Sequence, residues 1–130
     1  MIKKAIVVIG KEQSGKSNTI RIFKELIKIP NSNQKFKYKD IDGYIYSQTI
    51  QEKGKGDICS LANKVSKHDN IILPSRPQDC KDSMIKLTDI IRILEMYEFN
   101  ISFTTIAGDG QRKESYYKSK AKDILDLLEQ

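Results

Sequence analysis

The chain has 130 residues, of which 38% are hydrophobic and 31% are charged. This length and composition exclude a disordered chain and a multidomain protein, and they predict a single globular domain over residues 1–130. The formal net charge of +6 favours contact with polyanions such as nucleotide phosphates or nucleic acid.

The first predicted elements are a strand and a helix. Residues 3–9 are largely β-branched and apolar without alternation, which is typical of a strand buried on both faces in a parallel sheet. From Ser17 the apolar residues recur at spacings of three and four, which predicts a helix that ends before Pro30. The segment GKEQSGKS, residues 10–17, joins the two elements.

A β-hairpin is predicted next, over residues 35–50. Two β-rich runs flank the pair Asp42-Gly43, and an Asp-Gly pair favours the tight turns that connect hairpin strands. We expect one of these strands to be antiparallel to the rest of the sheet. Its lysines suit an exposed sheet edge.

Helices and strands alternate along the rest of the chain. A charged loop over 51–57 leads to a short helix over 58–65, with Asp57 in the N-cap position. Strands are expected over 70–74 and 101–106, separated by an amphipathic helix that Ser83 caps, and a last helix carries apolar residues at 124–128. This order predicts the α/β class, as a three-layer α/β/α sandwich with a mostly parallel sheet.

Residues 10–17 follow the pattern G-x-x-x-x-G-K-[ST], which combines several phosphate-binding features. Backbone amides in a loop before a helix N-terminus converge on an anion, and the helix dipole adds a favourable potential. Gly10 and Gly15 permit backbone angles and a close approach that a Cβ would hinder. Lys16 is expected to reach the β- and γ-phosphates, and the Ser17 hydroxyl to bind Mg²⁺.

Through this motif, known as Walker A, the chain resembles the P-loop NTPase superfamily. The resemblance covers residues 5–29 as a motif and extends further only as the order of strands and helices. It implies binding of ATP or GTP with Mg²⁺, and it does not identify a reaction. Gln13, Ser14 and Asn18 are further candidates for contacts with the phosphates.

Members of this superfamily usually carry a second motif, Walker B, whose acid binds the metal, and that acid is missing from its usual place here. An apolar strand ending in Asp is expected, but the segment NIILPSRP continues with Ser75 and Arg76. Asp69 stands at the opposite end of this strand from the edge where phosphate ligands gather. Asp57 is therefore the first candidate to complete the metal site with Ser17, and Asp79 is the second. A plain helix N-cap is an equally good interpretation of Asp57.

Two arginines are candidates for contact with the nucleotide. If its strand neighbours the first strand, Arg76 would lie near the phosphates and could act with Lys16 as a catalytic residue, stabilising charge on a transferring phosphoryl group. Arg112 follows the strand over 101–106, in a loop that could pass close to the base. A surface position or a structural ion pair is the alternative for both.

The predicted function is binding and hydrolysis of a nucleoside triphosphate. ATP is favoured over GTP because the sequence has no Asn-Lys-x-Asp segment for guanine. A switch with little turnover, in which nucleotide orders the 51–57 loop, and a kinase for a nucleotide or small molecule stay open as alternatives. The chain is small for this class, so a homo-oligomer could complete the site.

Nucleic acid is another partner class to consider. Tyr38, Tyr44 and Tyr46 lie beside lysines on the predicted hairpin and could stack bases, although aromatic residues at strand spacing more often pack across strands. The apolar runs are too short to span a membrane, and Cys59 and Cys80 are isolated. These features predict a cytoplasmic protein without a membrane partner.

Overall fold

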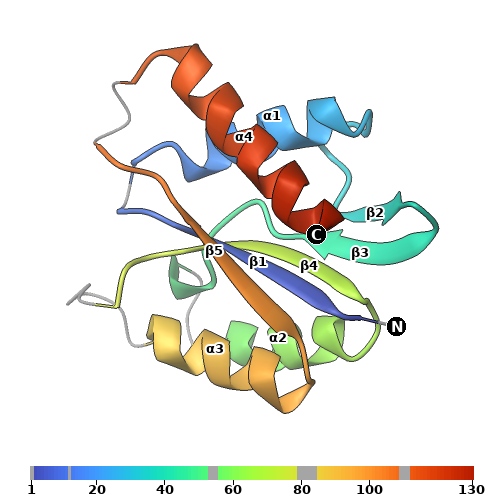
Figure 1. Cartoon of the computed structure of the whole chain (residues 1–130). Coiled ribbons are helices and arrows are strands. Elements are labelled where there is room, and N and C mark those ends of the chain that lie inside the picture. Colours follow the sequence, from blue (N-terminus) through green and yellow to red (C-terminus); the bar gives the residue numbers. More distant parts are fainter. Residues whose placement is uncertain (1, 12, 53–55, 79–84, 109–111) are drawn as a thin grey trace.

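The computed structural model describes residues 2–11, 13–52, 56–78, 85–108 and 112–130, with the backbone alone at 52, 56 and 57 (Figure 1). In chain order the elements are β1 (Lys4–Ile9), α1 (Lys16–Leu26), β2 (Lys35–Tyr38), β3 (Ile41–Ile45), the 3-10 helix η1 (Ile50–Glu52), α2 (Gly56–Val65), β4 (Asn70–Ser75), α3 (Leu87–Met96), β5 (Asn100–Thr105) and α4 (Glu114–Glu129).

The strands form one five-stranded sheet in the order β2-β3-β4-β1-β5. β1 lies between β4 and β5 and is parallel to both, with Lys4 opposite Asn70 and Asn100. β3 is parallel to β4, whereas β2, at one edge, is antiparallel to β3. The carboxyl ends of β1, β3, β4 and β5 therefore lie at the same end of the sheet.

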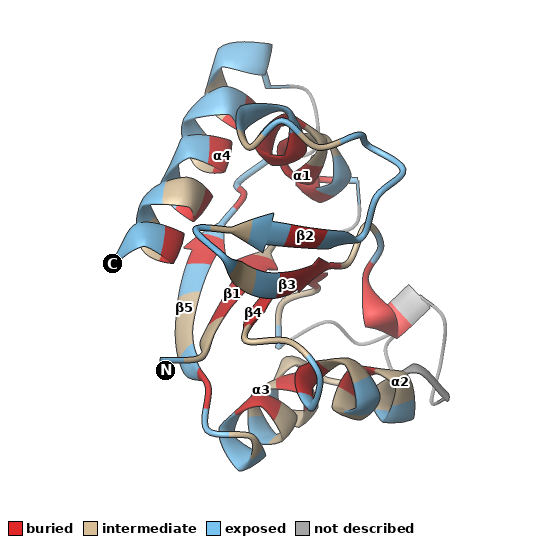
Figure 2. Cartoon of the chain, turned by 90° about the vertical axis from the view of Figure 1, so that its right-hand side faces the viewer, coloured by how far each residue is buried: buried red, intermediate tan, exposed pale blue. Residues whose placement is uncertain are grey.

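Helices cover both faces of the sheet, with α1 and α4 on one face and α2 and α3 on the other (Figure 1). Alternate residues of β1 divide between two hydrophobic cores. Ile6 and Val8 pack with α1 and α4, whereas Ala5 and Val7 pack with α2 and α3. Figure 2 shows the resulting buried layer along the central strands. The predicted α/β class and the mostly parallel sheet are confirmed.

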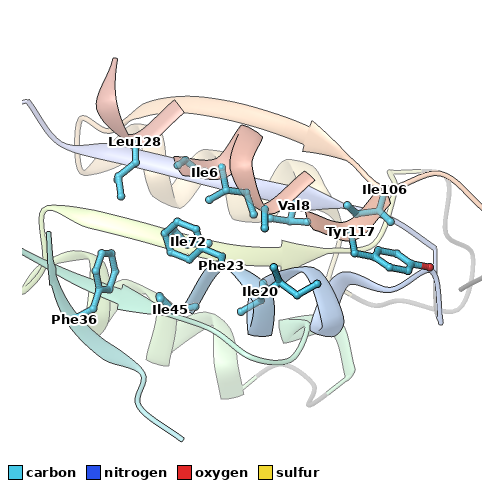
Figure 3. Packing of buried hydrophobic residues seen from close by; sticks show 13 residues of the cluster. Ile6, Val8, Ile20, Phe23, Phe36, Ile45, Ile72, Ile106, Tyr117 and Leu128 are labelled. Atoms are coloured by element: carbon cyan, nitrogen blue, oxygen red, sulfur yellow. The ribbon is translucent and has the colours of Figure 1, made fainter. Parts of the chain in front are cut away.

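The core between the sheet and the α1–α4 pair reaches the carboxyl end of β1. Figure 3 shows Phe23 of α1 near Ile72 of β4, with Leu128 and Tyr117 of α4 at opposite ends of the cluster. Tyr117 is only 3% exposed and lies beside the segment where α1 begins. The core thus extends directly beneath the loop that joins β1 to α1.

The topology creates a crevice between two neighbouring strands. The chain leaves β1 toward α1 on one face of the sheet, whereas it leaves β4 toward α3 on the other face. In open α/β sheets, ligands bind outside the carboxyl ends of the strands at such a reversal. The end of β1, where residues 10–17 begin, is one side of this crevice.

The predicted hairpin is present, but its predicted turn is wrong. Lys39 and Asp40 form the turn, and their φ angles of 50° and 66° suit the two central residues of a type I′ turn. Asp42 and Gly43 lie inside β3 instead. A Cβ on Gly43 would lie 2.3 Å from Cε1 of Phe36, so this glycine accommodates a ring on the neighbouring strand.

Two predicted helix starts also differ from the structure. α2 begins at Gly56, so Asp57 is inside its first turn and is not the N-cap. α3 begins at Leu87 after Lys86, whose backbone N–H donates to Asp89 Oδ2 at 2.8 Å. This local carboxylate bond sets the start of α3 later than predicted, and Ser83 lies outside the described residues.

Candidate functional site

The loop over 10–17 connects the end of β1 to the first turn of α1. Gly15 occupies the N-cap position of α1 in a left-handed conformation with φ 107°, and Gln13 also has a positive φ, 62°. The backbone N–H of Ser14 donates to the Lys11 carbonyl at 3.1 Å, which curls the loop. No side chain caps the helix among the described contacts, so the amides of its first turn face the space in front of the loop.

Both glycines of the loop are required by their surroundings. A Cβ on Gly10 would lie 2.3 Å from Ser14 Oγ and 3.3 Å from the Ile106 carbonyl. A Cβ on Gly15 would lie 2.3 Å from Cε1 of Tyr117, whose hydroxyl donates to the Ser14 carbonyl at 3.3 Å. Tyr117 of α4 therefore packs against the 10–17 loop, although the two are far apart in the sequence.

Lys16 closes the loop into a ring. Its ammonium donates to the carbonyls of Gly10 at 2.5 Å and Lys11 at 2.7 Å, and the residue is only 7% exposed. A buried lysine is stabilised by such charge-assisted bonds. The Lys16 ammonium is therefore held at the start of the loop, in front of the N-terminus of α1.

A cavity of about 300 Å³ opens in front of the loop, and we call it the first cavity. Loop and α1 residues line one side of it, and segments after β3, at the end of β4 and at the start of α4 line the rest. The lining residues are Gln13, Gly15, Lys16, Ser17, Asn18, Gln48, Thr49, Pro74 and Tyr117. The cavity therefore lies at the crevice between β1 and β4, and Lys16 contributes a positive charge to its lining.

Hydroxyl and amide groups lie at or beside the first cavity, near the segments that follow β3 and end β4. Ser17 Oγ donates to the Ser47 carbonyl at 3.3 Å, and Gln51 Nε2 donates to Ser75 Oγ at 2.9 Å. Thr49 is 2% exposed, and neither its Oγ1 nor Gln51 Oε1 has a hydrogen-bond partner among the described residues. Buried oxygens of this kind are normally satisfied, so a water, ion or ligand is expected beside them.

Lys24 is a second buried lysine, and sequence reasoning missed it. It is fully buried on α1, and its ammonium donates to the Asn31 carbonyl at 2.8 Å and to Ser47 Oγ at 3.3 Å. Burial lowers the pKa of its ammonium. Since Ser47 also accepts from Ser17, Lys24 anchors the segment over 46–49 next to the first cavity. Its spacing of four from Ile20, on the apolar face of α1, was the available signal.

The structure brings together some of the predicted site residues. Gln13, Gly15, Lys16, Ser17 and Asn18 all line the first cavity. Ser14 is fully buried, and its Oγ is close enough to Gly10 that it would obstruct a Cβ there.

The remaining predicted residues stand in different places. Arg76 directly follows β4, which is indeed the neighbour of β1, and it is partly exposed. Asp57 is in the first turn of α2, its side chain is not described, and Asp79 lies outside the described residues.

A second, larger cavity of about 650 Å³ lies on the other side of Gly10. The ends of β1 and β5 form its floor, Pro77 after β4 forms one wall, and Gly108 and Arg112 form another. Arg112, predicted near the nucleotide, therefore belongs to this second cavity. Lys11 also lines it, so its described lining includes two basic residues.

The tyrosines of the hairpin pack within the protein. Tyr44 is 7% exposed, and its ring is 5.0 Å from that of Tyr46 and 5.6 Å from that of His68. Tyr44 also donates to Gln34 Oε1 at 2.5 Å. Packing is therefore the role that the structure gives to Tyr44, and base stacking on its ring is disfavoured.

Comparison with protein-family models, with curated proteins and with solved structures gives no match for this chain. Within the described ranges, no group of three or more His, Cys, Asp or Glu side chains is placed to hold a metal ion. None of the described helices is long and apolar enough to cross a membrane. The candidate site therefore has to be interpreted from its own geometry.

Proposed function

We propose that this protein is a P-loop domain that binds a nucleoside triphosphate, ATP in preference to GTP, and hydrolyses it. The triphosphate would lie in the first cavity, with amides of the 10–17 loop and of the first turn of α1 donating to its oxygens. Lys16 would exchange its bonds to the Gly10 and Lys11 carbonyls for bonds to phosphate oxygens.

One observation supports this proposal above all others. The loop between β1 and α1 has its lysine ammonium held 2.5 Å and 2.7 Å from carbonyls at the start of the same loop, next to an uncapped helix N-terminus and a cavity. Convergent amides and a preplaced cation are what a polyphosphate requires. A glycine turn that binds nothing would have no reason to bury a lysine.

The oxygen donors beside the cavity fit Mg²⁺. Ser17 and Thr49 both line the cavity, and Thr49 Oγ1 is a buried oxygen with no hydrogen-bond partner among the described residues. Mg²⁺ typically takes one or two protein ligands together with phosphate oxygens and waters. When bound, Mg²⁺ would neutralise charge on the phosphates. Asp57 as a further ligand, and Arg76 as a residue that stabilises the transferring phosphoryl group, stay predictions.

A nucleotide-dependent switch is a second candidate, favoured by the bond from Ser17 to Ser47. This bond ties the start of α1 to the segment over 46–49, which also supplies Gln48 and Thr49 to the cavity. A ligand that engages Ser17 would release the Ser47 carbonyl and thereby shift this segment. The two candidates differ in turnover and share the same binding site.

Calorimetry with ATP and GTP in the presence of Mg²⁺ tests the proposal. Replacing Lys16 by Met is expected to weaken ATP binding about 10- to 100-fold, because a charge-assisted bond to phosphate is lost. Lys122→Met, an exposed position on α4, is the matched control and should bind as the wild type does. Equal affinity of Lys16→Met and wild type, or no binding of either nucleotide, would contradict the proposal.

Phosphate release measured on the same variants separates the two candidates. Hydrolysis predicts release that Lys16→Met abolishes and Lys122→Met retains. Tight binding without release supports the switch.

A further inference from the structure

The second cavity is not explained by binding of a triphosphate in the first. It has about 650 Å³, within the range of small-molecule sites, and the first cavity about 300 Å³. Both cavities lie at the carboxyl end of the sheet, the first between the ends of β1 and β4 and the second over the ends of β1 and β5. Gly10 lines the second cavity, and Lys16 Nζ binds its carbonyl.

The second cavity contains a preorganised guanidinium. Arg112 lies over the ring of Tyr116, with Cζ 5.0 Å from the ring centroid, and it passes Gly108 so closely that a Cβ there would be 3.0 Å from Nε. Gly108 has φ 96°, a conformation that favours glycine. Tyr116 is itself fixed, because its hydroxyl accepts from the Ala107 N–H at 2.8 Å. Arg112 therefore loses little freedom when it binds a ligand.

Among the residues that the structure describes, the charged ones that line the second cavity are of one sign. Lys11 and Arg112 both line it, and none of its described lining residues is acidic. Ile9 at the end of β1 and Ile106 directly after β5 add apolar side chains to the lining. A planar guanidinium binds carboxylate or phosphate through paired hydrogen bonds, and an apolar floor favours an organic body on that anion.

We propose that the second cavity binds a small organic anion, a carboxylate or a phosphate ester, at the same time as the nucleotide occupies the first cavity. The anionic group lies between Lys11 and Arg112, and the organic part covers Ile9 and Ile106. The simultaneous binding rests on the proposed function, since it requires a nucleotide in the first cavity. The anion site itself depends only on the second cavity.

Amide chemical shifts of the labelled protein test this site with phenyl phosphate and benzoate as the two anions and phenol as the neutral control. Molecules of this size are expected to bind with Kd on the order of millimolar. The shifts should concentrate at Gly10, Thr105, Ala107 and Gly108. Phenyl phosphate binding tighter than benzoate assigns a phosphate ester, and the reverse assigns a carboxylate.

Variants of the two cations sharpen the test. Arg112→Gln and Lys11→Gln should each weaken anion binding about tenfold, because each removes a charge-assisted bond. Lys118→Gln on the exposed side of α4 is the matched control and should leave the Kd unchanged. Arg112 and Lys11 are both exposed, so these variants are expected to keep the wild-type thermal stability.

Saturating ATP and Mg²⁺ separate this proposal from the proposed function. Anion shifts that persist with ATP bound, and that Arg112→Gln reduces, support the second site. Displacement of the anions by ATP overturns it, because they then occupy the phosphate site. Phenol binding as tightly as the anions, or no shifts around Gly108, overturns it as well. If ATP fails to bind while the anions do, the nucleotide function and simultaneous binding fail, and the anion site stands.

Discussion

Replacing Gly15 by Ala is expected to destabilise the protein through two separate effects. The first is backbone strain, because φ at Gly15 is 107° and an L-residue in this region costs about 1–3 kcal/mol. The second is a collision with the Tyr117 ring, whose Cε1 and Cζ would lie 2.3 Å and 2.7 Å from the new Cβ. Overpacking in a closed core costs about 1–3 kcal/mol. We expect a total loss of about 2–6 kcal/mol in the free energy of unfolding.

Gly108 provides a matched control for the backbone effect. Its φ of 96° is similar, but the nearest atom to an added Cβ is Nε of the exposed Arg112 side chain, at 3.0 Å. A shift of a few tenths of an ångström in this exposed side chain relieves the contact, so Gly108→Ala should cost only the strain of about 1–3 kcal/mol. The difference between the two alanine variants therefore measures the contact between the 10–17 loop and α4.

A double-mutant cycle measured by urea denaturation isolates this contact. Tyr117→Leu removes the ring that obstructs the Cβ, so the double variant should be more stable than the sum of the single effects by about 1–3 kcal/mol. Additivity of the two changes within about 0.5 kcal/mol would refute the reasoning, because it would mean that Tyr117 does not rest on Gly15.

Three further predictions concern other parts of the molecule. Burial lowers the pKa of Lys24 in the folded state, so the unfolded state binds the Lys24 proton more tightly. The free energy of unfolding of the wild type, relative to that of Lys24→Met, should therefore rise as the pH increases from the lowered pKa toward 10.5. A pH-independent difference in denaturation midpoints would contradict this. Asp40→Gly should stabilise the hairpin turn by about 0.5–1 kcal/mol in thermal unfolding, whereas Gly43→Ala should destabilise the protein. If Asp40→Gly destabilises the protein and Gly43→Ala does not, the turn would lie at residue 43 instead. Ser75→Ala should cost about 1–3 kcal/mol in chemical denaturation, because the buried Gln51 amide loses its partner, and an unchanged midpoint would exclude that bond.

The sequence predicted the elements whose signals are local. The apolar run of β1, the glycines and lysine of the 10–17 loop, and the apolar spacing of α1 are neighbours along the chain, and together they indicated the strand, loop and helix. The mostly parallel sheet followed from the alternation of strands and helices. These features follow from backbone preferences and periodicity, which short segments carry by themselves.

Contacts between distant segments were not predictable in the same way. The Asp42-Gly43 pair has the composition of a turn, but Gly43 lies in a strand, where it leaves room for the Phe36 ring on the adjacent strand. Lys39 and Asp40 adopt the left-handed turn angles instead. Likewise, the support of Gly15 by Tyr117 depends on how α4 packs beside α1. No single-segment pattern encodes such packing.

The central position of β1 has a consequence for how the protein folds. Lys4 pairs with Asn70 and Asn100, and the loop that follows β1 is completed by the Ser75 carbonyl, which accepts from Gly10, and by Tyr117. β1 is therefore made early in synthesis, whereas β4, β5 and α4, which it contacts, are made later, and contacts of large sequence separation slow folding. Until α4 has left the ribosome, Tyr117 is missing from its place against Gly15, and the unpaired edges of β1 expose the nascent chain to aggregation.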